Sequence, residues 1–520
     1  MSDDIDAPLD LLVLGSGVAG LSAAVRAARR GMRVGVLTKA ALDVSATRWA
    51  QGGVAAVLGG ADPDSTDLHL ADTLAAGDGL CDIDAVRVLV DEGPDRVHEL
   101  IALGAVFDRD AHGELARARE GGHSVARIVH AGGAATGMEI ERALVEAVLE
   151  TAATVLVRTF ALDLLVDGGR CRGVRAVGAQ GEPIEVRSRH VLMATGGAGQ
   201  LYGVTTNPLE ATGDGTAMAL RAGVAVADIE FVQFHPTALH HPLMPRPLLS
   251  EALRGHGALL RDTNGERFVD ELLSRDKVSR AITERMHVLG AEHVFLDATV
   301  LTDFDLRFPT IAASLAGVGL DPATDWLPVA PAAHYCCGGV VADLRGATSL
   351  PGLWAAGEVA CNGVMGANRL ASNSLLDGMV FAPRAVDAID EGADGPAPTG
   401  AMRAVLDGDD VAPGVIGGRR VVLPGVPSGA EAISRAELQA TMTEHAGVAR
   451  TAASLELAAA AASRPGAGAG VEAAEIDNLA IIARALCAAA LAREETRGAH
   501  ARVEFPDADP ALAVRFVVGG

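Results

Sequence analysis

The stretch LDLLVLGSGVAGLSAAVRAARRGMRVGVLTK, residues 9–39, decides the fold. Its order predicts an apolar strand, the glycine turn GSGVAG, an Ala-rich helix ending near Gly31 and a second strand. In such a unit Gly15, Gly17 and Gly20 let the backbone approach a pyrophosphate, whose charge meets the helix N-terminus. The stretch therefore predicts an α/β domain that holds a dinucleotide.

The end of the second predicted strand departs from the usual pattern. Leu37, Thr38 and Lys39 stand where an acidic residue normally binds the adenosine ribose. This departure disfavours a plain NAD-binding fold and requires a different ribose partner.

Two later segments, VLMATGG (191–197) and GLWAAGE (352–358), are again apolar runs that end in glycines, as expected of further strands in the same sheet. Asn-Gly and proline-rich motifs mark an inserted unit, a Gly/Pro/Asp-rich stretch follows, and an Ala/Leu-rich region with helical periodicity comes last. We expect a discontinuous nucleotide-binding domain over 1–229 and 341–405, an inserted α+β capping domain over 230–340, a linker over 406–429 and a C-terminal helical bundle over 430–520.

Composition excludes several classes of protein. The chain has 520 residues, is 49% hydrophobic and carries a net charge of −24, which opposes binding to nucleic acid or to anionic lipid. No charge-free apolar stretch is long enough to span a bilayer, and the acidic N-terminus MSDDIDAPLD is unlike a secretory signal, so we expect a cytoplasmic protein. Six cysteines show no metal-ligand spacing, so we expect reduced thiols and no metal.

Further motifs support a resemblance that covers nearly the whole chain. Lys39 after the second strand, ATRWAQGG (46–53), GDG around Asp214, GEV around Glu358 and ASNSLL (371–376) are similar to segments of the succinate dehydrogenase and fumarate reductase flavoprotein superfamily and, within it, most like those of the aspartate oxidases. The resemblance implies an FAD-binding, Rossmann-like domain. Its implied cofactor contacts are Gly15, Ser16, Gly17, Val18, Ala19, Gly20, Lys39, Ala46, Thr47, Ala50, Gln51, Gly52, Gly53, Asp214, Glu358, Ser374 and Leu375.

One departure within the superfamily concerns the flavin linkage. Membrane-complex members carry a histidine that bonds covalently to the flavin, whereas this sequence has Ala46 at the matching position. The resemblance therefore implies non-covalent FAD, as in the aspartate oxidases.

Four segments supply cationic or hydrogen-bonding groups for a small dicarboxylate, whose two charges call for Arg and His donors. They are FVQFHPT with His235, PAAHYCCGG with His334, RDKVSRAI with Arg280 and GANRLASNS with Arg369. The resemblance implies that these four residues bind substrate or catalyse, with Arg280 either transferring a proton or stabilising charge. It also implies substrate contacts from Thr237 and Ser250.

Glu120, in REGGHSVARIVHAGG (119–133), separates the candidate substrates. A carboxylate beside an anionic substrate is repulsive unless it faces a cation, and the α-ammonium of aspartate is such a cation, which succinate lacks. The segment resembles the aspartate oxidases. The alternative is an ion pair of Glu120 with Arg117 or Arg119.

Together these features predict FAD-dependent oxidation of L-aspartate to iminoaspartate, with O2 or fumarate as electron acceptor. The resemblance further implies a role in NAD biosynthesis through quinolinate, with possible hand-over of product to quinolinate synthase. One rival is the flavoprotein subunit of a succinate dehydrogenase or fumarate reductase, since ETRGAHARVEFPDADP (495–510) is shared with that group. The other is a flavin-binding sensor without turnover.

Overall fold

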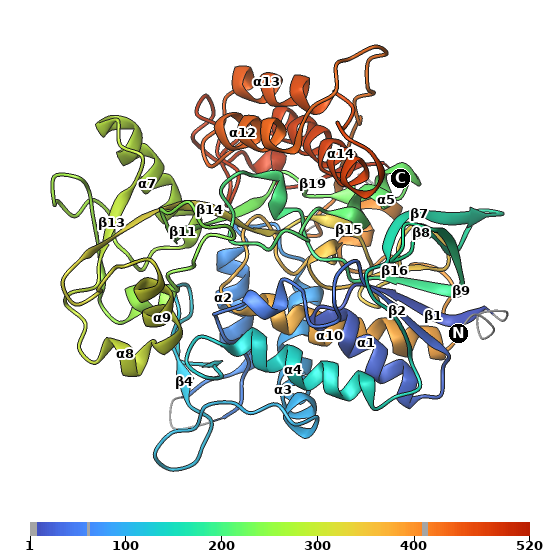
Figure 1. The fold of residues 1–520 in the computed structure, drawn as a ribbon, viewed down its shortest axis with the longest axis horizontal. Coiled ribbons are helices and arrows are strands. Elements are labelled where there is room, and N and C mark those ends of the chain that lie inside the picture. The colour runs from blue at the N-terminus through green and yellow to red at the C-terminus, as the bar shows by residue number, and fades with distance from the viewer. Residues whose placement is uncertain (1–7, 60–62, 408–413, 520) are drawn as a thin grey trace.

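The computed structural model describes residues 8–59, 63–407 and 414–519. Its largest sheet carries the glycine turn (Figure 1). The strand order is β6 (Thr154–Leu156), β2 (Val34–Leu37), β1 (Leu9–Leu14), β9 (Pro183–Met193), β8 (Arg170–Val177) and β7 (Phe160–Asp167), with β16 (Leu353–Ala355) also paired to β9. The pairs that join β6, β2, β1, β9 and β16 are parallel, and β8 and β7 extend the sheet as antiparallel strands. The three segments that end in glycines thus lie in neighbouring strands, as the sequence predicts.

The glycine turn between β1 and α1 (Val18–Arg29) has no room for larger residues. Gly15 has a φ of +106°, and a Cβ there would lie 2.3 Å from the carbonyl oxygen of Ala194. A Cβ on Gly20 would lie 2.1 Å from the carbonyl oxygen of Gly15, so α1 can pack directly on the turn only because residue 20 is glycine. Gly17 stands at the N-cap, and no side chain caps the helix there.

Helices cover the lower side of this sheet in Figure 1. They are α1, α3 (Ile83–Ala102), α4 (Thr136–Leu149) and α10 (Asn373–Asp390). Their apolar faces share one buried core, to which Val25, Leu89, Leu144 and Val380 contribute. This packing fixes α10 with its first turn at the cavity described below.

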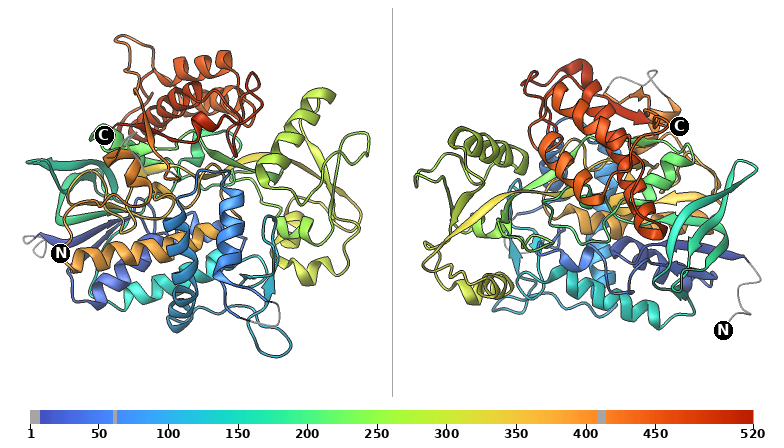
Figure 2. Two further views of the ribbon diagram at one scale, coloured as in Figure 1. Left: turned by 180° about the vertical axis from the view of Figure 1, so that it is seen from behind. Right: turned by 45° about the horizontal axis from the view of Figure 1, so that its top comes forward.

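The capping domain is an antiparallel sheet with its own core, set to one side of the nucleotide-binding body (Figures 1 and 2). The strand order is β11 (Val232–Leu239), β14 (Trp326–Cys336), β13 (Val294–Asp297) and β12 (Leu259–Arg261). Its helices are α6 (Glu251–Gly255), α7 (Arg275–Leu289), α8 (Phe304–Arg307) and α9 (Pro309–Gly317). All of these elements fall inside the interval 230–340, although the boundaries themselves stay a prediction.

The C-terminal region is helical but also returns a strand to the body of the protein. Helices α12 (Arg435–His445), α13 (Ala452–Ala462) and α14 (Gly470–Ala492) lie together at the top of Figure 1. After them β19 (Arg515–Val518) joins a second sheet in the order β17 (Ala360–Cys361), β15 (Gly339–Val341), β10 (Val226–Ala227), β19 and β18 (Gly418–Val421).

Strand β18 lies inside the predicted linker over 406–429, where the sequence indicates a loop or linker rather than packed core. It pairs in parallel with β19 from Gly418↔Arg515 to Val421↔Val518. The Gly/Pro-rich segment forms a strand because a distant strand offers it a backbone partner, which local sequence does not report. Part of the predicted linker, 408–413, lies outside the described residues.

Smaller elements complete the fold. They are the sheet β3 (Val54–Ala55), β5 (Ile128–Val129) and β4 (Arg117–Ala118), and the helices α2 (Thr66–Ala76), α5 (Asp214–Arg221) and α11 (Arg403–Leu406). The predicted fold class, an α/β nucleotide-binding domain with an α+β insertion and C-terminal helices, is confirmed. Within the described ranges no helix has the length and apolar character needed to cross a bilayer, and no cluster of three or more His, Cys, Asp or Glu could hold a metal.

Candidate active site

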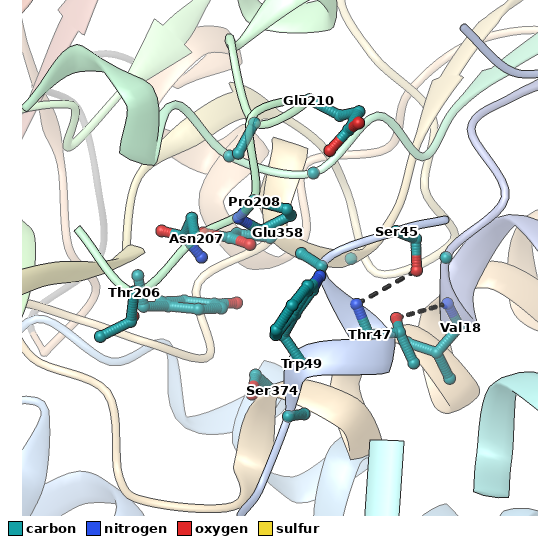
Figure 3. Close-up of a pocket in the computed structure, with 18 of the residues that line it drawn as sticks. Val18, Ser45, Thr47, Trp49, Thr206, Asn207, Pro208, Glu210, Glu358 and Ser374 are labelled. Carbon is teal, nitrogen blue, oxygen red and sulfur yellow. Dashed lines mark hydrogen bonds between the residues drawn. The ribbon is translucent and has the colours of Figure 1, made fainter. Parts of the chain in front are cut away.

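One continuous cavity of about 490 Å³ runs from the glycine turn to the capping sheet. In Figure 3 Val18 and Thr47 lie on one side of it and Thr206 and Glu358 on the other, with Trp49 between them. Every predicted cofactor residue except Gly20 lines this cavity: Gly15, Ser16, Gly17, Val18, Ala19, Lys39, Ala46, Thr47, Ala50, Gln51, Gly52, Gly53, Asp214, Glu358, Ser374 and Leu375. Gly20 instead packs beneath the turn.

The turn and the loop at 44–53 form one polar wall of the cavity. The backbone N–H of Val18 donates to Thr47 Oγ1 at 2.9 Å, which ties the start of α1 to the loop (Figure 3). Gln51 Oε1 and Thr195 Oγ1 are buried, belong to lining residues and have no hydrogen-bond partner among the described residues. A glycine-lined approach beside a helix N-terminus, with unpaired polar atoms nearby, fits the pyrophosphate and polar edges of FAD.

Ala46 lines the cavity, and its methyl group offers no atom for a covalent bond to the flavin. Ser374 and Leu375 also line the cavity, in the first turn of α10. The N-terminus of α10 carries partial positive charge, which favours electron-rich groups next to it. These residues fit non-covalent FAD.

The adenosine end of the cavity holds the carboxylate that the second strand lacks. Lys39 Nζ forms an ion pair with Asp214 Oδ2 at 2.8 Å and donates to Glu475 Oε1 at 2.7 Å. Both Lys39 and Asp214 line the cavity. A carboxylate at this end of the cavity is thus brought by α5 instead of by the end of β2.

Glu358 lies deeper in the same cavity, where it accepts the backbone N–H of Cys336 at 3.0 Å. Burial raises the pKa of Glu358 to about 7. Because this carboxylate lacks a cationic partner at hydrogen-bond distance among the described residues, hydroxyl donors from a bound cofactor would stabilise its charged form.

The substrate end is formed by two histidines of the capping sheet. His235 and His334 lie on the paired strands β11 and β14 with their rings 5.2 Å apart, and both line the cavity. His235 Nδ1 accepts the backbone N–H of Thr237, so its proton is on Nε2, which has no partner among the described residues. Burial and the charge of Arg275 lower the pKa of both histidines well below 6.5. They are therefore neutral hydrogen-bonding groups.

Arg369 lines the same cavity as these histidines. Its Nη1 donates to Ser374 Oγ at 2.7 Å, and its Nε and Nη2 donate to Gln233 Oε1 at 3.2 and 3.1 Å. The guanidinium also lies over the ring of Tyr335, 4.8 Å from its centroid. Burial and the charge of Arg275 lower the pKa of Arg369 to about 10, which leaves it positively charged at neutral pH.

Arg280 is not brought to the cavity, which corrects the prediction made for it. Its guanidinium pairs with Asp276 on the same helix at 2.9 Å and donates to the carbonyl of Gly498. Arg275, the first residue of the quoted RDKVSRAI segment, lines the cavity instead. The buried residues of α7 are Arg275, Val278, Ser279 and Ile282, which share one face of the helix. Arg280 is not on this buried face.

Arg275 is held by two buried partners. Its Nε donates to Glu251 Oε2 at 2.9 Å, and its Nη1 donates to Gln233 Oε1 at 3.1 Å. Gln233 therefore accepts from Arg275 and Arg369 together and fixes the two guanidinium groups side by side. Sequence reasoning missed Arg275, Gln233 and Glu251. Arg275 and Gln233 stand in the quoted RDKVSRAI and FVQFHPT segments, and Glu251 directly follows the predicted Ser250.

The two hydroxyl residues predicted to contact substrate differ. Ser250 lines the cavity at the N-cap of α6. Thr237 does not line the cavity, and its Oγ1 donates to the carbonyl of Leu249 at 2.8 Å. The structure therefore gives Thr237 a part in fixing the loop that carries Ser250.

Glu120 lines the cavity and is 3% exposed. Its Oε2 accepts from Ser372 Oγ at 2.7 Å, and its Oε1 lies 3.3 Å from His130 Nε2. The alternative ion pair is wrong, since the side-chain Nε of Arg119 donates to the carbonyl of His123 and that of Arg117 to the carbonyl of Leu115. Burial alone would raise the pKa of Glu120, but His130 and Ser372 outweigh it and lower that pKa to about 2.

The chain matches known proteins over nearly its whole length. Residues 10–375 match the FAD binding domain family, and residues 463–515 match the fumarate reductase flavoprotein C-terminal family. An L-aspartate oxidase of Streptomyces coelicolor is 49% identical, with 98% of this chain and 91% of that protein covered. The chain belongs to the L-aspartate oxidase family.

Other members of the family and more distant structures agree with this placement. L-aspartate oxidases of Mycobacterium leprae and of the chloroplast of Arabidopsis thaliana are 46% and 41% identical, each over 98% of this chain and over 95% and 83% of the relative. A chain of Escherichia coli quinol fumarate reductase has the same fold, with a TM-score of 0.82, 30% identity, and 97% and 93% of the two chains covered. The predicted flavoprotein superfamily and FAD cofactor are therefore confirmed.

Proposed function

We propose that the chain oxidises L-aspartate to iminoaspartate with FAD as its cofactor. The observation that carries this proposal is Glu120, an ionised, buried carboxylate in the same cavity as Arg275, Arg369 and two neutral histidines. A cavity for a plain dicarboxylate needs only the cationic and hydrogen-bonding groups. A carboxylate added to them suits a substrate that also carries a cation.

The two arginines and two histidines of the cavity bind both substrate carboxylates. Arg369 and Arg275 offer fixed planar N–H donors, and His235 offers an unpaired Nε2–H. Because Gln233 already holds the two guanidinium groups, little side-chain freedom is lost when substrate binds. The α-carbon is thereby fixed at one position along the cavity.

Glu120 binds the ammonium group of aspartate. With its pKa at about 2, this carboxyl is charged at every physiological pH, so it holds a cation well and is a poor proton acceptor. Ser372 and His130 fix its orientation. Glu120 therefore selects and positions the amine instead of deprotonating it.

Oxidation of aspartate breaks the Cα–H bond, releases one proton from nitrogen and forms a C=N bond. FAD, when bound, supplies the two-electron acceptor for this reaction. The chain holds the Cα against the cofactor end of the cavity, next to the buried side chains of His235 and Arg369. Arg275 keeps a positive charge beside the substrate carboxylates as charge shifts during the reaction.

The electron acceptor after aspartate oxidation is O2 or fumarate. The similarity of the chain to a solved quinol fumarate reductase supports fumarate as an acceptor. The product then enters NAD biosynthesis through quinolinate, with transfer to quinolinate synthase, and the reaction takes place in the cytoplasm.

The test uses purified holoprotein without oxygen. Loss of the oxidised-flavin absorbance on addition of aspartate, with little change on addition of succinate, is the expected result. Loss with succinate and none with aspartate would instead establish the rival reading, a fumarate reductase or succinate dehydrogenase flavoprotein. An unchanged spectrum with both would favour the flavin-binding sensor.

A further inference from the structure

The C-terminal helix α14 reaches the adenosine end of the cofactor cavity. Glu475 and Asn478 are three residues apart on α14 and therefore share one helix face. Each contacts a residue that lines the cavity, although neither of the two lines it. The cavity is thus backed by a region 250 or more residues away in the sequence.

Glu475 holds Lys39. Its Oε1 accepts from Lys39 Nζ at 2.7 Å, and its Oε2 accepts from Arg435 Nη2 at 2.6 Å. Lys39 also donates to Thr212 Oγ1, so its ammonium has three partners with Asp214 included. The side chain of Glu475 is 16% exposed, so water screens these contacts only partly.

Asn478 holds Asp214. Its Nδ2 donates to Asp214 Oδ1 at 2.9 Å, and its Oδ1 accepts from Arg221 Nη1 at 2.6 Å. Arg221 therefore fixes which end of the amide faces Asp214. Thr212 Oγ1 donates to the same Oδ1 at 2.8 Å. Asp214 Oδ1 thus has two donors, while Oδ2 pairs with Lys39.

We infer that Glu475 and Asn478 are positioning residues for FAD: they fix Lys39 and Asp214 in the geometry that receives the adenosine end of the cofactor. The inference rests on FAD binding, as the proposed function does, and adds the C-terminal helices to the cofactor site. A lysine has several rotatable bonds, and fixing it before the ligand arrives removes an entropic cost from binding. The same holds for the carboxylate that Asn478 orients.

The test is titration of apoprotein with FAD, followed by quenching of flavin fluorescence, with no substrate present. Asn478→Ala and Glu475→Ala each remove hydrogen bonds to a charged group, so each should raise the Kd for FAD about tenfold. Glu475→Gln, which keeps the shape and an acceptor for Lys39, should have a smaller effect. Glu472→Ala is the matched control, because Glu472 is exposed one turn earlier on α14.

A double-mutant cycle separates positioning from general destabilisation. In a Lys39→Met background, Glu475→Ala should change the Kd for FAD by less than twofold, because its effect passes through Lys39. An equal loss in both backgrounds would overturn the inference, and so would an unchanged Kd combined with a lower melting temperature of the apoprotein. Tighter FAD binding by Glu475→Ala would also overturn it, since Glu475 would then compete with the cofactor for Lys39. None of these outcomes bears on aspartate oxidation, which the anaerobic test with substrate decides separately.

Discussion

Arg275 and Arg280 provide a matched pair of substitutions on one helix. Arg275→Lys keeps the positive charge but loses the planar group that bonds to Glu251 and Gln233 at 2.9 and 3.1 Å. Because Gln233 also orients Arg369, the change loosens both cationic groups of the substrate site. We expect the rate of flavin reduction by aspartate to fall about 10²- to 10³-fold, which is about 3–4 kcal/mol of transition-state stabilisation.

Arg280→Lys serves as the control for this experiment. The side chain of Arg280 is 30% exposed and pairs with Asp276 outside the cavity, so the rate should stay within about threefold of wild type. Anaerobic stopped-flow measurement of flavin reduction at saturating aspartate separates the two variants, and the melting temperature of each holoprotein shows whether folding is intact. A large loss in Arg280→Lys beside a near-normal Arg275→Lys would refute the placement of Arg275 in the reaction.

Two further predictions concern cofactor binding and pH. Gly15→Ala would place a Cβ 2.3 Å from the carbonyl oxygen of Ala194, so the Kd of this variant for FAD should rise more than about tenfold. The control is Gly31→Ala, which is also at positive φ but in open space and should bind FAD normally. Equal FAD titration curves for the two variants would contradict this prediction. Burial raises the pKa of Glu141 to about 8, so the folded chain holds this proton more tightly than the unfolded chain, and stability falls as pH rises from about 4.5 to 8. Glu141→Gln should therefore raise the melting temperature by a few °C at about pH 8.5 and by less at about pH 5, and an equal gain at both would argue against it.

Local sequence was enough to predict the features that depend on near neighbours. The glycine turn follows from residues 15–20 alone, because the φ of Gly15 and the close approach at Gly20 are properties of that turn. Glu120 could be proposed from its segment, since its neighbours differ between the superfamily branches. Its partner His130 lies in the same segment, whereas its partner Ser372 became known only from the fold, because Ser372 comes from the start of α10.

Features that depend on tertiary contact could not be predicted in the same way. Nothing near Lys39 indicates that its carboxylate partners come from α5 and α14, and nothing in the Gly/Pro-rich segment indicates that β18 will pair with β19. The error at Arg280 has a different origin, because helical periodicity was present in the sequence. Arg275 shares a face with the apolar Val278 and Arg280 does not, so the period of the helix could have distinguished them.

The central claim is that Glu120 makes this dicarboxylate cavity specific for an amino acid. The most direct measurement compares wild type, Glu120→Gln and the control Glu114→Gln, an exposed residue near the same loop, for anaerobic flavin reduction by aspartate and for flavin oxidation by fumarate. We expect Glu120→Gln to lose at least about 10²-fold in kcat/KM for aspartate while its reaction with fumarate is retained, and Glu114→Gln to resemble wild type. Equal losses with both substrates, or an unchanged reaction with aspartate, would contradict it.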